Sequence, residues 1–131
     1  MPKRSRAAIL GLLIVTVVAL AACRPPAPPP AAGTTGLTCR GNAVIGDIIG
    51  NAFAGTSVGP YMDEVIVPRE SGCDPNALNR SSGAAGLFQL LGHGDLIAAC
   101  PYLWRSPFDA YCNAWAARQL YNGSGLAPWA L

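Results

Sequence analysis

The residues best suited to chemistry lie between positions 70 and 90. Glu70 follows the apolar run Val65-Ile66-Val67, and Phe88 and Gln89 come after a loop of small residues. A glutamate in an apolar setting can keep its proton near neutral pH, because burial disfavours the charged form, and the leaving oxygen of a glycosidic bond requires a protonated acid. We expect the apolar run and Phe88 to supply that setting. Considered alone, however, Glu70 is better explained as a hydrated glutamate at a helix end.

Two short blocks in this stretch form a recognisable pattern. The first is Glu70-Ser71-Gly72 followed by Pro75, Ala77 and Asn79, and the second is Ser82-Gly83-Ala84 followed by Gly86-Leu87-Phe88-Gln89. In this order and spacing they resemble the E-S-G and G-L-M/F-Q motifs of the soluble lytic transglycosylase (SLT) family of lysozyme-like proteins. The resemblance implies a compact, mainly α, lysozyme-like domain. It also implies cleavage of the β-1,4 bond between N-acetylmuramic acid and N-acetylglucosamine in peptidoglycan.

Most glycosidases use two carboxylates, whereas the resemblance implies one. Asp74 and Asp95 follow Glu70 in the chain, but Asp74 fits better as a turn residue before Pro75. Members of the family use a single glutamate, first as acid and then as base. The N-acetyl group of the substrate assists, and the 6-hydroxyl of the sugar attacks to leave a 1,6-anhydro end. The resemblance therefore implies that Glu70 is the catalytic residue.

The same resemblance suggests five substrate-binding residues, each with a plainer alternative. Gln89 falls on the cleft glutamine of the family, although a buried amide that pairs with the backbone would look the same. Ser71 would orient the carboxylate or cap the helix end. Phe88 would contact sugar or pack in the core, and Gly86 would shape the loop along the cleft floor. Tyr121 lies in a degenerate form of a family motif whose tyrosine faces the acid.

Trp104, Trp115 and Trp129 could stack on sugar rings, although most of them are expected in the core, and His93 could line the cleft. Trp104, beside Arg105 in an expected loop, is the best candidate for a sugar platform, because aromatic faces stack on sugar rings. Trp115 is expected in the core. His93, flanked by glycines, fits an exposed loop position better than a cleft position.

The N-terminus has the pattern of an export signal. Residues 1–22 contain a basic start and an uncharged apolar run that is short for a membrane span. The run ends in Leu20-Ala21-Ala22-Cys23, which resembles a bacterial lipoprotein signal with Cys23 as the lipidated residue. An ordinary cleaved signal and an uncleaved anchor are the alternatives. Residues 23–38 are expected to be a proline-rich linker, and 39–131 the folded domain.

Cysteine content and charge limit the kinds of function that the chain could have. Cys39, Cys73, Cys100 and Cys112 remain after Cys23, and an even number outside the cytosol predicts two disulfides with three possible pairings. A zinc site is not expected, nor is any cofactor, because the chain has one histidine and no C-x-x-C. Six arginines and seven acids from Cys23 onward, with no basic stripe, argue against nucleic-acid binding. We expect a monomer on the outer face of the cytoplasmic membrane, held by its lipid and facing the glycan strands of the wall.

The hydrophobic pattern predicts a mainly α domain. Helices are expected over 42–54, 59–71, 95–100 and 106–121, the last with Ser106 as N-cap and Pro107 in its first turn. In the first of these, Ile45, Ile48, Ile49, Ala52 and Phe53 share one face. In the second, Tyr61, Val65 and Ile66 are expected to face inward. Pro68 lacks a backbone donor, so either the helix kinks there or Glu70 lies on a separate last turn.

Three other functions remain open from the sequence. A muramidase would hydrolyse the same bond with the same acid. A wall-binding lipoprotein would keep the fold and bind peptidoglycan without turnover. A secreted structural or inhibitory lipoprotein would share the E-S-G motif by accident. Product analysis separates the first from a transglycosylase, and glycan binding separates the second from the third.

Overall fold

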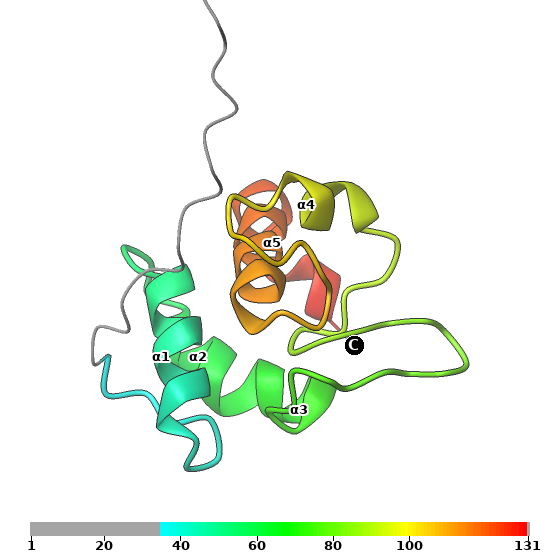
Figure 1. Ribbon diagram of the computed structural model, residues 1–131. Helices are drawn as coiled ribbons and strands as arrows, with labels where there is room; N and C mark the ends of the chain where they lie inside the picture. The colour runs from blue at the N-terminus through cyan, green and yellow to red at the C-terminus, as the bar shows by residue number, and fades with distance from the viewer. Residues whose placement is uncertain (1–34, 131) are drawn as a thin grey trace, which may run out of the picture.

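The computed structural model describes residues 35–130, which form one mainly helical domain (Figure 1). The elements in order are α1 (Ala43–Ala52), α2 (Gly59–Tyr61), the π-helix η1 (Met62–Ile66), α3 (Val67–Ser71), α4 (Gly94–Ala99), α5 (Ala110–Ser124) and the 3-10 turn η2 (Ala127–Trp129). Within residues 35–130 there is no β-strand, only three isolated bridges. The expectation of a mainly α fold is confirmed. The expected signal, Cys23 and most of the linker lie outside the described residues.

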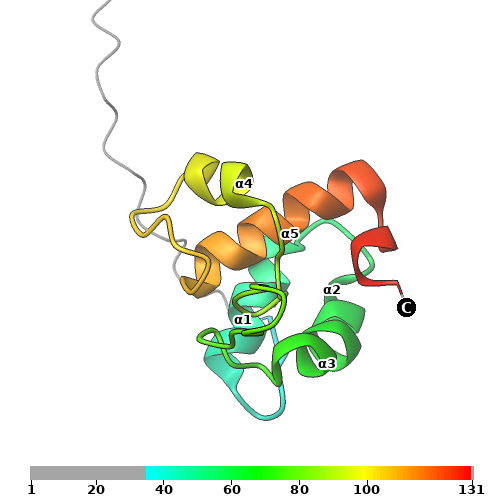
Figure 2. The same cartoon turned by 90° about the vertical axis from the view of Figure 1, so that its right-hand side faces the viewer.

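No helix within the described range is long and apolar enough to cross a membrane. Figure 2 shows α5 running the length of the molecule, with α4 on one side and the α2–η1–α3 segment on the other. The core between them is built from aliphatic and aromatic side chains, of which Phe53, Phe88, Ile49 and Met62 are among the largest fully buried. Phe53 links three parts of this core, because its ring lies 5.7 Å from Phe88 and 5.8 Å from Tyr121.

The first helix forms as its sequence predicts. Asn42 caps it by accepting a hydrogen bond from the backbone N–H of Ile45 at 3.2 Å. Its apolar face is buried as expected, with Ile45, Ile48, Ile49 and Phe53 all at most 5% exposed. Gly46 and Gly50 weaken the helical pattern of α1, but both are in close contact with the segment that precedes the helix. A Cβ at Gly46 would lie 2.1 Å from the carbonyl oxygen of Leu37, and one at Gly50 would lie 2.6 Å from Thr35.

The N-terminal segment 35–38 therefore lies directly on α1, although the sequence places these residues in the linker. Thr35 is tied to Asp47 by its backbone N–H at 2.7 Å and by its hydroxyl at 2.9 Å. A shortened form of the protein should therefore retain Thr35 if it is to keep this contact with α1.

The helix that carries Glu70 contains a π turn, which explains how it accommodates Pro68. Residues Met62–Ile66 form η1, and the backbone N–H of Val67 bonds to the carbonyl of Met62. The wider turn needs no donor from Pro68, which lies in the first turn of α3. Glu70 thus lies on a separate last stretch, Val67–Ser71, which ends at Gly72 in the left-handed conformation.

The π turn also changes which residues face inward. Tyr61 and Val65, expected in the core, are 43% and 40% exposed, so this part of the prediction is wrong. Ile66 is buried as expected, and Met62 and Asp63 are buried with it. A pattern of 3.6 residues per turn does not continue through a π turn, so Tyr61, which precedes η1, and Ile66, at its end, do not share one face as predicted.

Asp63 is an acid in an unusual position. It is 3% exposed, and its Oδ1 has no hydrogen-bond partner among the described residues. Burial raises the pKa of the Asp63 carboxyl above 3.8, an effect opposed by the Thr38 backbone N–H and reinforced by Glu64. Because the folded-state pKa exceeds the unfolded value, the folded protein is destabilised by the ionised carboxylate and gains stability as the pH falls through the folded pKa.

We predict that Asp63→Asn stabilises the protein at pH 7 by about 1 kcal/mol, because a neutral amide is less costly to bury than a poorly paired carboxylate. Thermal unfolding across pH 3–7 measures this. The advantage should shrink as the pH falls through the folded pKa and vanish below the unfolded value of 3.8. Asp95→Asn, on the exposed start of α4, is the control. A variant less stable than wild type at pH 7 would contradict the prediction.

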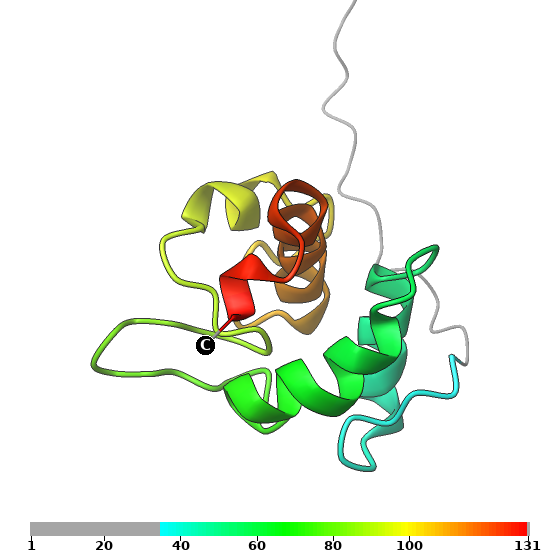
Figure 3. The same ribbon diagram turned by 180° about the vertical axis from the view of Figure 1, so that it is seen from behind.

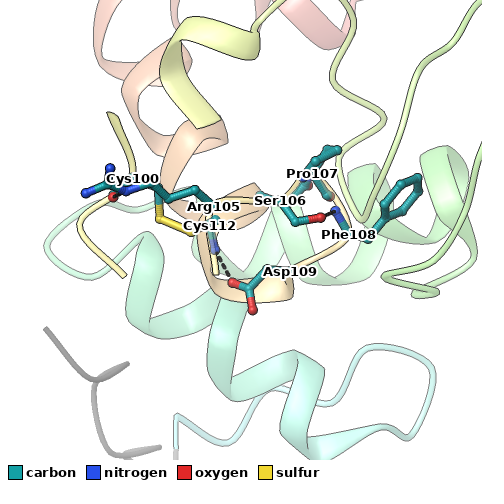
Figure 4. The surroundings of a disulfide bond; sticks show 8 residues. Cys100, Arg105, Ser106, Pro107, Phe108, Asp109 and Cys112 are labelled. Carbon is teal, nitrogen blue, oxygen red and sulfur yellow. Dashed lines mark hydrogen bonds between the residues drawn. A yellow bond between two sulfur atoms is a disulfide. The ribbon is translucent and has the colours of Figure 1, made fainter. Parts of the chain in front are cut away.

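The long helix α5 starts later than its sequence indicates. The N-cap is Asp109, whose Oδ1 accepts from the backbone N–H of Cys112 at 2.8 Å. Ser106, expected as the cap, instead accepts from Phe108 N–H at 3.2 Å in the turn before the helix (Figure 4). Phe108 lies in this turn and is 38% exposed. The helix continues through Asn122-Gly123 to Ser124, and Gly125 ends it with a φ of +58°.

Two disulfides join the four expected cysteines. Cys39 pairs with Cys73, which connects the segment before α1 to the turn after α3, and Cys100 pairs with Cys112 between the end of α4 and the start of α5 (Figure 4). Of the three possible pairings, the structure has this one. Cys39 and Cys73 are 34 positions apart in the sequence, and Cys100 and Cys112 are 12 positions apart.

We predict that reduction lowers the free energy of unfolding by roughly 2–4 kcal/mol for each disulfide, with the larger loss for Cys39–Cys73 because it closes the longer loop. The double variants Cys39→Ser/Cys73→Ser and Cys100→Ser/Cys112→Ser separate the two contributions in thermal unfolding. Peptide mapping of the unreduced protein checks the pairing. An identical melting curve with and without reductant would contradict the prediction.

Candidate active site

A pocket of about 170 Å³ lies where the end of α3, the segment after the small-residue loop and the C-terminal turn meet. Its lining comes from three distant parts of the chain: Glu70; Phe88, Gln89, Leu90, Leu91 and His93; and Leu120, Pro128 and Trp129. Figure 3 shows the C-terminal turn, in red, lying between α5 and the green loop that follows α3. The structure thus brings Glu70, Phe88 and Gln89, three of the residues that the sequence singles out, into one pocket.

Glu70 is the only acidic side chain among those that line this pocket, and it is 24% exposed. Asp74, the first alternative acid, accepts from the backbone N–H of Asn76 at 2.8 Å in an exposed turn. Asp95 is exposed in the first turn of α4. Neither of them lines the pocket, so no second carboxylate is paired with Glu70 there.

The apolar surroundings of Glu70 differ from those expected. Of the four residues predicted to supply them, Phe88 lines the pocket, whereas Val65, Ile66 and Val67 do not. The apolar walls come instead from the 88–91 segment and the end of the chain, above all from Leu120, Pro128 and Trp129. Trp129, which the sequence offers as a possible sugar-stacking residue, lies here together with Leu120 and Pro128, although all three are far from Glu70 along the chain.

Gln89 both lines the pocket and pairs with the backbone, the two alternatives that its sequence position left open. Its Nε2 donates to the carbonyl oxygens of Ala77 at 3.2 Å and Gly86 at 3.0 Å, so the amide is fixed by the backbone. Its side chain also lines the pocket. No hydrogen bond from the described residues reaches its Oε1, which can therefore accept one from a ligand. The residue has a φ of +48°, which is uncommon for a side chain other than glycine.

Asn113 holds the loop in place, and the sequence analysis did not identify it. This residue of α5 is completely buried. Its Oδ1 accepts from Phe88 N–H at 2.8 Å, and its Nδ2 donates to the carbonyls of Ala85 at 3.1 Å and Pro107 at 2.9 Å. The available signal was an asparagine on an otherwise apolar helix face between Cys112 and Trp115, since a buried amide must be bonded.

Three predicted substrate-binding residues lie outside the pocket lining. The Ser71 hydroxyl donates to the carbonyl of Val67 at 3.2 Å, one turn back in α3. Gly86 is buried against Pro107 and Asn113 and has a φ of +79°. Tyr121 packs edge-on against Phe53, with the ring centroids 5.8 Å apart. Phe88, another predicted substrate-binding residue, combines two roles: it is buried in the core at 1% exposure, and it also lines the pocket.

The tryptophans and the histidine are arranged differently from expectation. Trp129 lines the pocket, whereas Trp104 is 69% exposed outside it and Trp115 is half-buried beside α1. His93, expected on an exposed loop, is half-buried and lines the pocket. Leu90 and His93 also line a second recess of about 160 Å³ toward Pro107. Within residues 35–130 no group of three or more His, Cys, Asp or Glu side chains could hold a metal ion.

Comparison with known proteins gives relatives for part of the chain. It is 42% identical over 69 residues to two proteins of Staphylococcus saprophyticus named probable transglycosylase SceD 1 and SceD 3, and 43% identical over 67 residues to the probable transglycosylase SceD of Staphylococcus haemolyticus. The matches cover 49–50% of this chain but only 28–29% of those relatives. No family model and no solved structure matches. The chain therefore spans less than a third of the length of these relatives, whose names describe them as probable transglycosylases.

Proposed function

We propose that this protein is a peptidoglycan lytic transglycosylase with a lysozyme-like domain and a single catalytic acid, Glu70. The observation that carries the proposal is the pocket in which Glu70 is the only carboxylate and lies among apolar side chains, with Gln89 beside it. The E-S-G and G-L-F-Q motifs meet there, and the partial relatives named probable transglycosylases support the same class of reaction.

The proposed chemistry uses one acid, as the resemblance to the SLT family implies. Glu70 donates its proton to the glycosidic oxygen, and the bond between that oxygen and the anomeric carbon of N-acetylmuramic acid breaks. A second carboxylate, which other glycosidases use as nucleophile or to activate water, is absent from the lining of the pocket. In the proposed reaction the substrate supplies the nucleophile. Its N-acetyl oxygen stabilises the anomeric carbon, and Glu70, now a base, accepts the proton of the 6-hydroxyl as that oxygen attacks and forms the 1,6-anhydro ring.

The remaining predicted residues have proposed supporting roles. Gln89 would accept a hydrogen bond from the sugar through Oε1, since its Nε2 is engaged by the backbone. Phe88 would form the apolar floor. Ser71 and Gly86 would act through the backbone, the first at the end of α3 and the second in the loop. A contact between Tyr121 and substrate would require its ring to leave Phe53.

We further propose that the domain works on the outer face of the cytoplasmic membrane as a monomer held by a lipid on Cys23. Support comes from the sequence pattern that ends at Cys23, from the proline-rich segment after it, and from two disulfides that suit an exported protein. Globomycin treatment of a bacterial host that expresses the chain tests the anchor. Accumulation of the uncleaved form is expected, and normal processing would contradict lipidation.

Release of soluble fragments from purified peptidoglycan sacculi tests the proposed activity. The full chain with its disulfides formed should solubilise the sacculi, and Glu70→Gln should not. If wild type binds sacculi but releases nothing, the protein is a wall-binding module instead. If it neither binds nor cleaves, the resemblance of the two motifs is accidental.

A further inference from the structure

Arg69, next to the proposed acid, contacts both Glu70 and the end of the chain. Its Nη2 donates to Glu70 Oε1 at 2.9 Å, and its Nε donates to the same oxygen at 3.3 Å. The same Nη2 also donates to the backbone carbonyl of Trp129, which lies 60 residues away in sequence. The Arg69 side chain is 33% exposed and is not part of the pocket lining, so it holds Glu70 from the protein surface rather than from the core.

The C-terminal partner of Arg69 is itself fixed. Trp129 is 5% exposed, and its indole N–H donates to the carbonyl of Phe88 at 3.2 Å. Its ring centroid lies 5.8 Å from that of Phe88. A continuous set of contacts therefore runs from Phe88 through Trp129 and Arg69 to Glu70, and it joins the loop, the C-terminal turn and the end of α3. Figure 2 shows this turn, in red, above the green helical segment that ends in α3.

These contacts distinguish the two oxygens of Glu70. Both hydrogen bonds from Arg69 fall on Oε1, and no hydrogen bond from the described residues falls on Oε2. A protonated carboxyl group keeps one oxygen that can only accept, so Arg69 can remain on Oε1 in either protonation state. Oε2 is then the oxygen that carries the proton toward the substrate.

We propose that Arg69 is the positioning residue of Glu70, holding Oε1 so that Oε2 faces the glycosidic oxygen, with the C-terminal turn as its anchor. This inference rests on the proposed function. A pair of neighbouring exposed side chains would hold nothing firmly, because such ion pairs exchange with water and are worth little. The third contact, to a carbonyl of a buried tryptophan, gives the guanidinium a fixed position from which to hold the acid.

Kinetics on soluble, uncrosslinked glycan strands test the role of Arg69. Arg69→Ala should lower kcat about tenfold, because a misplaced acid reacts more slowly, and should leave KM within about twofold. Arg69→Lys should recover part of the loss, since an ammonium keeps the charge but lacks the planar fork that reaches two acceptors. A fall in kcat at constant KM would indicate that Arg69 positions the acid, whereas a rise in KM would indicate that it binds substrate.

Arg118→Ala is the matched control. Arg118 also binds backbone carbonyls, those of Ala52 at 3.0 Å and Ala54 at 2.9 Å, but its other hydrogen bond is to Asn122 and not to Glu70. It should lose stability without losing kcat at a temperature where it is folded. Wild-type kcat in Arg69→Ala, or an equal loss in Arg118→Ala, would overturn the positioning role alone. A wild-type protein that cleaves no glycan would overturn the proposed function and the role of Arg69 together.

Discussion

Glu70→Gln is expected to lower the rate of glycan cleavage roughly a thousandfold while leaving the fold and glycan binding intact. The amide has the shape of the carboxyl group and can still accept from Arg69, but it cannot give a proton to the glycosidic oxygen. No other carboxyl group lines the pocket to replace it. Rates on sacculi or soluble strands measure the effect, and sedimentation with sacculi measures binding.

Glu64→Gln is the matched control for this experiment. Glu64 is exposed on η1, in the same helical segment but outside the pocket lining. Removing its charge should change the rate by less than about twofold, because exposed charges act weakly through water. Comparable activity in Glu70→Gln and wild type would mean that another group is the acid.

Gly86→Ala is expected to destabilise the domain by about 3 kcal/mol or more, enough to unfold much of the protein at growth temperature. Gly86 has a φ of +79°, and an added Cβ would lie 2.1 Å from Pro107 O and 2.2 Å from Asn113 Nδ2. Both neighbours are fixed by their mutual hydrogen bond at 2.9 Å. The methyl group would therefore displace the amide that holds the Phe88 loop. Thermal and denaturant unfolding measure the loss.

Gly83→Ala separates this clash from backbone strain. Gly83 has a similar φ of +84°, yet nothing lies within 4 Å of an added Cβ. It should cost only about 1 kcal/mol, the usual strain of a non-glycine residue in this conformation. Equal effects of the two substitutions would show that the close packing of Asn113 against Gly86 contributes nothing.

The sequence predicted the parts of this protein that depend on local pattern. The face of α1, the short α4 and the loop between Glu70 and Phe88 follow from apolar spacing, caps and turn residues that lie next to one another in the chain. The convergence of Glu70 and Gln89 in one pocket was accessible through the two motifs. These features need no knowledge of how distant segments meet.

The predictions that failed, and the features that were missed, depend on non-local contacts or on a rare helix form. Tyr61 and Val65 are exposed where the helix widens into the π turn Met62–Ile66, and single-sequence periodicity cannot detect such a turn. Asp109 replaced Ser106 as the cap of α5, because both types can cap and only the fold selects one. Trp129 was one of three tryptophans that could stack on sugar, and only the tertiary packing places it rather than Trp104 in the pocket.

Mass spectrometry of the fragments released from purified sacculi tests the central claim most directly. A lytic transglycosylase that uses Glu70 as its only acid should release muropeptides ending in 1,6-anhydro-N-acetylmuramic acid, and Glu70→Gln should release none. Fragments with ordinary reducing ends, heavier by one water, would mean that water rather than the 6-hydroxyl attacks. That result would contradict the account and make the protein a muramidase.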